Sequence, residues 1–329
     1  MARDVILGLL AATLGALGAF LVSRFGRRLG LIDRPTPRSS HTRETPKGGG
    51  IGITAAFLVT AVVLGFPVAF WLPLAVLSGL ALRGDQVEIS PRLRLPAQFI
   101  LAGVLVVGTG AGAFRDLPGG WLSLFWVVFI VGTANFFNFM DGINGIAGIS
   151  GAVGFGLLAF ATHRGQPEAA LLAACLALAC VGFLPFNLPR ARVFMGDAGS
   201  ILLGAAFAGL VCLTSRSWVD LLCRAAFLFP FYCDELTTMA VRLRAGEDLT
   251  RPHRRHVYQL LANELRLPHG RVAAAYGLAQ LLVGTCALWA RTSGTRVLLA
   301  VLAGWFALFA LGGYVIRKRA RAGKKIEGT

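Results

Sequence analysis

Charged residues are scarce in this 329-residue chain: it has 16 Asp and Glu against 32 Lys and Arg, and only 15% of its residues are charged. Hydrophobic residues make up 56% of the chain, and the mean hydropathy is +0.68. This composition excludes a soluble domain and indicates an integral membrane protein. The net charge of +16 does not predict nucleic-acid binding, because no basic face can be separated from the apolar runs.

Cysteine is also sparse. The six cysteines all fall within apolar runs and form no CxxC pair, which excludes a metal site and a disulfide framework built from them. The sequence has no linker, low-complexity tract or clear internal repeat, so residues 1–329 are expected to form a single integral membrane domain. The first 23 residues are apolar like a signal peptide, but their positive charge follows the run, and we interpret them as a retained first span.

Long apolar runs predict an all-α polytopic membrane protein with 10 or 11 transmembrane helices, about 11 by our count. Several runs are shorter than the roughly 20 residues that a hydrocarbon core requires, and the pair at 51–65 and 69–82 is the weakest. The predicted spans are 4–23, 51–65, 69–82, 96–113, 121–140, 145–162, 169–186, 199–214, 218–241, 272–290 and 297–316.

The basic residues assign an orientation to these spans. If the N-terminus lies outside and the chain alternates, most of the 32 Lys and Arg fall in inner loops and in the C-terminal tail. The positive-inside rule therefore predicts an outer N-terminus and a cytoplasmic C-terminus. The basic segments are 24–47, 83–94, 190–192, 242–271 and the tail from 317.

The stretch NFFNFMDGINGIAG, residues 135–148, carries polar residues at the inner end of an apolar run. Asn135, Asn138 and Asp141 are three residues apart, so on a helix they share roughly one face. An Asp at the centre of a membrane helix costs about 2.5 to 3.5 kcal/mol, and such residues usually mark functional sites. The alternative is a polar cluster at a helix end that carries no chemistry.

Two more inner loops carry charge. In the loop at 31–53, three glycines follow Lys47, and they would let backbone amides approach an anion while Lys47 adds a positive charge. The alternative is a basic loop that only holds the orientation. Asp85 lies at the inner end of another span, where a solvated loop residue is the more common explanation.

The stretch FLPFNLPRARVFMGDAGSILLG places Asn187 at the end of one span and Asp197 at the start of the next. A small-residue turn before a helix presents free N–H groups, and an Asp beside it suits a hard cation such as Mg²⁺. A simple helix N-cap is the alternative. Asp234 and Glu235 lie within the span at 218–241 and imply a polar cavity there.

The last long inner loop holds His253 and His256 among several arginines, including Arg254. His-x-x-His can bind a metal, but neighbouring arginines repel cations and favour phosphate. A basic surface loop without a site is the alternative. Because the carboxylates, Lys47 and this loop all fall on one membrane face, the sequence predicts a site for phosphoryl transfer with a divalent metal.

Four blocks occur in order along nearly the whole chain: DRPTPRSSHTRETPKGGG, NFFNFMDGINGIAG, FNLPRARVFMGDAGS and PHRRHVYQ. With these blocks the chain resembles the polyprenyl-phosphate N-acetylhexosamine-1-phosphate transferases (glycosyltransferase family 4), which are related to the phospho-N-acetylmuramoyl-pentapeptide transferases. The ending HRRHVYQ is similar to the O-antigen-initiating branch, because the other branches tend to carry a denser run of histidines.

The resemblance implies roles for individual residues. Asp141 and Asn138 would belong to the catalytic and nucleotide-sugar pocket, and Asp197 and Asp141 would hold Mg²⁺, with Mn²⁺ as an alternative ion. Asp85 matches the second Asp of the family's Asp-Asp pair, and Asp234 matches an acidic position in its span. The further substrate contacts that the resemblance implies are Lys47, Asn187, His253, Arg254 and His256.

Two positions depart from the family. Gly84 stands where the family has the first Asp of its pair, which is a candidate base for deprotonating the lipid phosphate. Asn144 stands where many members have Asp. Since a phosphate monoester has a second pKa of about 6 and is mostly dianionic at neutral pH, loss of that base weakens the expectation of activity without removing it.

The resemblance implies transfer of N-acetylhexosamine 1-phosphate from a UDP-sugar to undecaprenyl phosphate, with release of UMP, at the cytoplasmic face of the bacterial inner membrane. The product would start O-antigen or another cell-envelope glycan, and a homodimer is left open. The rival interpretation is a non-catalytic lipid-phosphate binder or transporter, which Gly84 supports. Ionisable residues near one face, and not at the midplane, disfavour a transporter.

Overall fold

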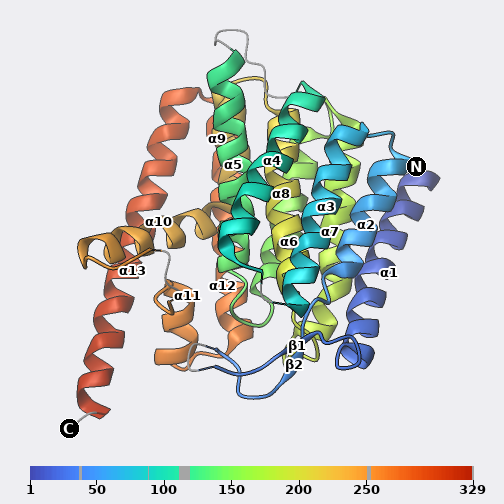
Figure 1. The fold of residues 1–329 in the computed structure, drawn as a ribbon. Helices are drawn as coiled ribbons and strands as arrows, with labels where there is room; N and C mark the ends of the chain where they lie inside the picture. The colour runs from blue at the N-terminus through green and yellow to red at the C-terminus, as the bar shows by residue number, and fades with distance from the viewer. Residues whose placement is uncertain (37–38, 88, 111–118, 250–252, 328–329) are drawn as a thin grey trace.

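The computed structural model describes residues 1–36, 39–87, 89–110, 119–249 and 253–327, which form a bundle of helices (Figure 1). Its elements are α1 (Ala2–Phe25), β1 (Ile32–Asp33), β2 (Thr45–Pro46), α2 (Ile51–Val63), α3 (Val68–Gln86), α4 (Pro91–Thr109), α5 (Gly119–Phe139), α6 (Ile146–Thr162), α7 (Pro167–Asn187), α8 (Gly196–Thr214), α9 (Trp218–Ala225), the 3₁₀ turn η1 (Ala226–Leu228), α10 (Phe229–Arg244), α11 (Val257–Gln259), the π turn η2 (Leu260–Glu264), α12 (His269–Thr292) and α13 (Thr295–Glu327).

The helices confirm the all-α polytopic architecture. Within the described residues, eight helices are long and apolar enough to cross a membrane: α1, α3, α4, α5, α7, α8, α12 and α13. The shorter apolar helices α2 and α6 fall on the predicted spans 51–65 and 145–162. The predicted span 96–113 begins too late, because α4 starts at Pro91, and its last residues, 111–113, lie outside the described residues.

The predicted span 218–241 is not one helix. The chain forms α9, η1 and α10 in its place, with Pro230 in the first turn of α10. Proline has no N–H to donate, so it is well tolerated in the first turn of a helix, where the N–H groups have no partner within the helix. In Figure 1, α10 runs across the direction of the bundle helices beside α13, and this turn directs Asp234 and Glu235 into the protein.

Helix α8 lies at the centre of the bundle (Figure 1), and 83% of the residues in its apolar stretch are buried. Small residues allow this close packing: a Cβ on Gly204 would come within 2.6 Å of the Thr133 carbonyl oxygen on α5. Because van der Waals contact replaces the hydrophobic effect between helices in lipid, small residues favour such approaches. The N-terminus of this buried helix carries Asp197, so the core of the bundle fixes that carboxylate in place.

The strands β1 and β2 pair antiparallel, with Ile32 opposite Pro46, and they tie the first loop across the ends of the helices. The glycines after Lys47 then pack against the residues that precede α8. The amides of Gly49 and Gly50 donate to the carbonyl oxygens of Phe194 and Met195, each at 2.9 Å. The expectation that these amides would face an anion is therefore wrong, because they are used inside the fold.

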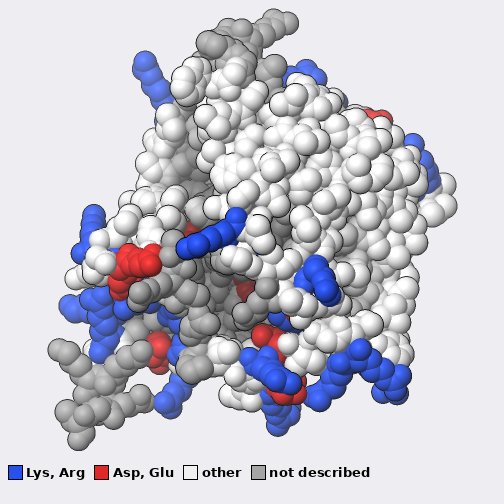
Figure 2. All heavy atoms as spheres, viewed as in Figure 1, with Lys and Arg blue, Asp and Glu red and all other residues white. Residues whose placement is uncertain are grey.

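Charge is distributed unevenly over the surface. Figure 2 shows Lys and Arg side chains gathered toward the lower end of the molecule, where β1 and β2 lie, below a broad and mostly uncharged surface. An uncharged band beside a basic end is what a membrane and the positive-inside rule require. The orientation itself stays a prediction.

Candidate active site

Residues predicted from four separate segments line one cavity of about 340 Å³. They lie at the end of the bundle that carries β1 and β2, where the first loop passes beneath α3, α5, α7 and α8 (Figure 1). Side chains more than 100 positions apart in the sequence therefore share one space. The predicted residues that line it are Lys47, Asp85, Asn138, Asp141, Asn187 and Asp197.

Asp85 is buried in the last turn of α3 and is not a solvated loop residue, which corrects the simpler expectation for this position. Its Oδ1 lies 3.6 Å from Nζ of Lys47, and its Oδ2 accepts the backbone N–H of Ala198 at 3.3 Å. The first residues of α8 still have free N–H groups, so a carboxylate is stabilised there. Lys47 and α8 together hold the charge of Asp85 at the cavity wall.

Asp197 lies in the first turn of α8, and Met195, not Asp197, is the N-cap residue. Its carboxylate forms an ion pair with Arg94, with Nη2 of Arg94 2.8 Å from Oδ2 of Asp197. One turn further on, the hydroxyl of Ser200 donates to Oδ1 of Asn138 at 2.7 Å and so joins α8 to α5. The simple N-cap alternative therefore does not describe Asp197, which presents its charge to the cavity.

Asp141 lies in the loop after α5, half-buried, and lines the same cavity. Burial raises the pKa of Asp141 well above its ordinary value, and the charges of Asp197 and Asp85 raise that pKa further. Carboxylates that repel one another in a shared space require a cation or a proton to relieve the repulsion. The site is thus built to attract positive charge.

Asn187 holds the far side of the Asp141 loop. Its Oδ1 accepts the backbone N–H of Gly145 at 2.5 Å, and its Nδ2 donates to the carbonyl oxygen of Val193 at 2.9 Å. Gly145 has a φ of +85°, a conformation that only glycine adopts readily. Asn187 is 6% exposed, so these two contacts support the loop rather than leaving the amide free for a ligand.

Several cavity residues were missed by reasoning from the sequence. His41 packs edge-on against Phe194 with ring centroids 4.8 Å apart, and His269 at the start of α12 accepts the backbone N–H of Asn144 at 3.3 Å. Gln259 also lines the cavity and was missed, as was the pairing of Arg94 with Asp197. His41 lies inside the first quoted block, so the block itself was a signal; His269 follows a short loop without a motif, and only the fold brings it to the site.

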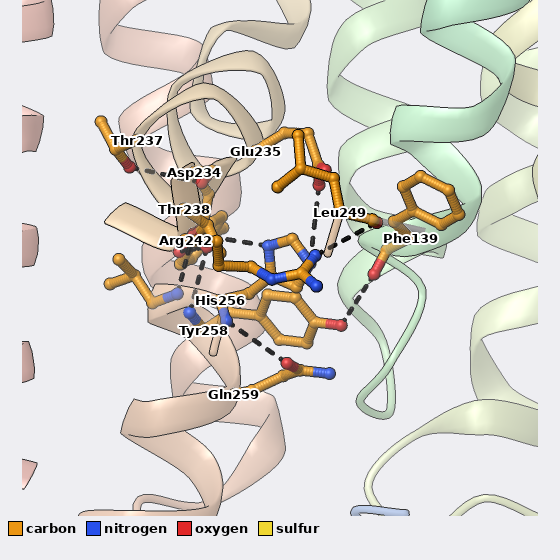
Figure 3. A network of polar contacts seen from close by, with 12 residues as sticks. Phe139, Asp234, Glu235, Thr237, Thr238, Arg242, Leu249, His256, Tyr258 and Gln259 are labelled. Carbon is orange, nitrogen blue, oxygen red and sulfur yellow. Dashed lines mark hydrogen bonds and ion pairs between the residues drawn. The ribbon is translucent and has the colours of Figure 1, made fainter. Parts of the chain in front are cut away.

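His256 was predicted to contact substrate, but the structure buries it away from the cavity. It is 3% exposed and lies between two acids of α10: Nδ1 is 3.7 Å from Oδ1 of Asp234, and Nε2 is 3.5 Å from Oε2 of Glu235 (Figure 3). The polar cavity predicted around Asp234 and Glu235 is thus filled by the protein's own side chains. His256 is also the N-cap residue of α11.

His253 and Arg254 line a second cavity, to which residues of α10, η2 and α13 also contribute. Arg254 pairs with Glu264, with Nη2 3.1 Å from Oε1, and the pKa of His253 is lowered to about 4, chiefly by burial and then by His256 and Arg242. His253 is therefore neutral near pH 7. The structure does not bring these two residues to the carboxylates, and their contact with substrate stays a prediction.

The two departures from the family lie close to the carboxylates. Among the described residues, the nearest atom to a Cβ on Gly84 would be Cδ1 of Ile89, at 4.0 Å, so those residues leave room for an aspartate there. Asn144 lines the cavity itself, and its Nδ2 lies 3.5 Å from the Pro189 carbonyl oxygen. The site therefore contains fewer acids than the family pattern, but it has the space for them.

The acids that line the cavity fit Mg²⁺, which takes few protein ligands, better than a metal ion whose ligands all come from the protein. In the described part of the chain, no three His, Cys, Asp or Glu side chains come close enough together to form a metal site. Mg²⁺ usually takes one or two carboxylates and completes its shell with water and substrate phosphates. Asp141 and Asp197 supply such carboxylates in one cavity, so these residues would hold Mg²⁺ that is shared with a phosphate ligand.

Comparison with known proteins agrees with this geometry. Residues 67–215 match the model of glycosyl transferase family 4, and that range contains Asp85, Asp141 and Asp197. The chain is 28% identical to the decaprenyl-phosphate N-acetylglucosaminephosphotransferase of Mycobacterium tuberculosis, over 88% of this chain and 82% of that protein. It is 29% identical to the undecaprenyl-phosphate alpha-N-acetylglucosaminyl 1-phosphate transferase of Thermotoga maritima, over 74% and 77%.

A third relative gives the highest identity of the three. The phospho-N-acetylmuramoyl-pentapeptide-transferase of a Synechococcus species is 33% identical over 64% of this chain and 69% of that protein. With this likeness, and with the acids of the matched region gathered in one cavity at the end of a membrane bundle, the chain belongs to the polyprenyl-phosphate N-acetylhexosamine-1-phosphate transferase family, glycosyl transferase family 4.

Proposed function

We propose that this protein transfers N-acetylhexosamine 1-phosphate from a UDP-linked sugar to undecaprenyl phosphate, in a Mg²⁺-dependent reaction that releases UMP. The observation that carries the proposal is the cavity shared by Asp85, Asp141, Asp197 and Lys47. Paired acids with adjacent cations are what phosphoryl transfer requires, since the reaction moves negative charge between phosphates.

The chemistry needs little covalent help from the protein. An oxygen of the lipid phosphate attacks the β-phosphorus of the UDP-sugar, a new P–O bond forms, and the bond from the β-phosphorus to the bridging oxygen breaks, so that UMP leaves with that oxygen. A phosphate monoester is mostly dianionic above its second pKa of about 6, so the attacking oxygen already carries charge at neutral pH. The glycine at position 84 is compatible with this reaction.

The chain's own residues orient the reacting phosphates. Lys47 adds a positive charge beside Asp85, and Arg94 adds another beside Asp197, where each can bind a phosphate oxygen as the ligand enters. Asp141 and Asp197 would hold Mg²⁺, which when bound supplies a Lewis acid that offsets charge on the transferred phosphate. Asn138 is held by Ser200 at the cavity wall, where its amide can contact the sugar nucleotide.

The membrane explains the position of the site. A polyprenyl tail stays in the hydrocarbon while its phosphate reaches the polar end of the bundle, where the cavity lies. With the orientation from the positive-inside rule, that end faces the cytoplasm of a bacterial plasma membrane, where UDP-sugars are available. The motif HRRHVYQ, at residues 253–259, favours O-antigen as the glycan that this reaction starts.

A second candidate function is lipid-phosphate binding without catalysis. Gly84 and Asn144 favour it, because both replace acids of the family pattern at or beside the cavity. Such a protein would bind undecaprenyl phosphate and leave the UDP-sugar intact.

The test is transfer of radiolabelled sugar from UDP-N-acetylhexosamines to undecaprenyl phosphate by purified protein. Asp141→Asn and Asp197→Asn should each lower turnover at least about 100-fold, because each removes a carboxylate that would hold Mg²⁺ at the phosphate site. Asp4→Asn is the matched control, since Asp4 is exposed at the start of α1, and it should keep wild-type turnover. Unchanged turnover in both cavity variants would refute the site assignment.

A further inference from the structure

Asp234 is a buried acid outside the cavity, and its carboxylate accepts four hydrogen bonds. It is fully buried in α10 and accepts the backbone N–H groups of Val257 at 2.8 Å and Tyr258 at 3.1 Å (Figure 3). It also accepts the hydroxyls of Tyr276 at 2.6 Å and Thr238 at 3.1 Å. A buried carboxylate needs several donors, and two of these four are the first amides of α11, so Asp234 caps that helix from a different helix.

Helix α11 requires such support. It has three residues and continues into a five-residue π turn, and helical segments this short are unstable alone. His256 and Gln259 form a capping box at its start. At its far end, Nδ2 of Asn263 donates to the Ser40 hydroxyl at 3.0 Å. The segment from 256 to 264 is therefore fixed by contacts to α10 and to the first loop.

Tyr258 connects this fixed segment to the Asp141 loop. Its ring is fully buried, and its hydroxyl donates to the carbonyl oxygen of Phe139, the last residue of α5, at 2.9 Å (Figure 3). The last carbonyls of a helix have no partner within the helix, so this contact fixes the end of α5. A Cβ on Gly142 would overlap the same hydroxyl. Tyr258 thus lies against residues on both sides of Asp141.

We propose that Asp234 and Tyr258 are positioning residues, which hold the Asp141 carboxylate opposite Asp197 through α11. We call this pair with its contacts the brace. The proposal rests on the proposed function for its effect on turnover, but the contacts themselves do not depend on it. It also gives His256 a role: the histidine packs between Asp234 and Glu235 and supports the brace, away from the substrate cavity.

Tyr258→Phe removes one hydroxyl and leaves the ring in place, so it tests the brace with little risk to folding. We expect kcat to fall about five- to tenfold, the effect of losing one hydrogen bond that holds a reacting geometry, with a higher Mg²⁺ concentration for half-maximal turnover. Tyr232→Phe is the matched control. The Tyr232 hydroxyl contacts Thr133, also on α5 but two turns before Asp141, at 2.9 Å, and kcat should not change.

A double-variant cycle separates positioning from general structural damage. Gly142→Ala should be strongly inactivating in the wild type, because the new Cβ overlaps the Tyr258 hydroxyl. In Tyr258→Phe the hydroxyl is absent and the nearest ring atoms lie at 3.0 and 3.2 Å from that Cβ, so much of the loss should be recovered. Independent, multiplicative losses in the double variant would contradict the brace.

Hydrogen–deuterium exchange of residues 139–145 gives a readout that needs no activity. Tyr258→Phe should increase exchange there by at least about threefold, and Tyr232→Phe should not, because only the first loosens the end of α5. Unchanged exchange in Tyr258→Phe would overturn the proposal, whatever the turnover. If the wild type transfers no sugar phosphate, the proposed function fails, and the exchange result alone then decides whether the brace is correct.

Discussion

Removing the charge of Lys47 should destabilise the protein through Asp85. The Asp85 side chain is 3% exposed, and its Oδ1 lies 3.6 Å from Nζ of Lys47. At an effective dielectric constant of about 20, unit charges at this separation attract by about 4 to 5 kcal/mol. The Lys47 side chain is 26% exposed, so solvent screens part of this attraction, and we expect Lys47→Met to lose about 2 to 3 kcal/mol.

The assay is thermal unfolding of purified protein in detergent, with transfer activity measured in parallel. An unfolding entropy of about 2 cal/mol/K per residue turns this loss into a fall in Tm of about 3 to 4 °C for a chain of 329 residues. Adding Asp85→Asn to Lys47→Met removes the negative charge that the first change leaves unpaired. The asparagine keeps a side-chain oxygen that can accept the Ala198 N–H. The double variant should therefore recover most of the Tm while remaining inactive.

Lys318→Met is the matched control, because Lys318 is exposed on α13 and far from the cavity in sequence and in the fold. Its Tm should equal that of the wild type. A Lys47→Met protein as stable as the wild type would refute the reasoning, and so would a double variant no more stable than the single one. In either case the ion pair would not be what holds Asp85 in the cavity wall.

Three further predictions concern the cavity. Gly84→Asp should raise turnover by less than tenfold in transfer assays, because the wild type is already active; a gain of several hundredfold from a nearly inactive wild type would instead support the lipid-phosphate binder. Arg94→Gln should lower the Mg²⁺ concentration for half-maximal turnover, because Asp197 loses its resident cation; an unchanged or higher requirement would contradict competition between the two. The raised pKa of Asp141 favours its protonated form, so without Mg²⁺ its contribution to stability is present at low pH and lost as pH rises through the shifted pKa. At limiting Mg²⁺, turnover should therefore fall as pH falls through that value, and added Mg²⁺ should move the fall to lower pH; a profile independent of Mg²⁺ would argue against a shared site.

The cavity could be predicted from the sequence because acids in apolar helices are costly. Asp141 and Asp197 stand out against their surroundings for this reason, and the span pattern places them at one face. The span pattern did not indicate a role for Arg94. The positive-inside rule already accounts for arginines near span ends and gives no reason to single one out. Its pairing with Asp197 becomes visible only when α4 lies beside α8.

Other elements depended on contacts that no local pattern encodes. Hydropathy does not show that the span at 218–241 is divided into α9, η1 and α10, although that division turns Asp234 toward α11. His256 and its neighbours were interpreted as phosphate contacts from their basic surroundings, but which side of α11 a histidine faces is decided by the acids of α10. The amides of Gly49 and Gly50 were expected to approach an anion, but they donate to the backbone before α8 instead.

Placing a ³²P label on the β-phosphate of the UDP-sugar tests the central claim most directly. If the chain transfers sugar 1-phosphate, purified protein with Mg²⁺ should move the label to the undecaprenyl product and leave unlabelled UMP. Label that stays in UDP while sugar reaches the lipid would show a different bond being broken. No labelled lipid at all, with intact UDP-sugar, would contradict the account and leave the protein as a lipid-phosphate binder.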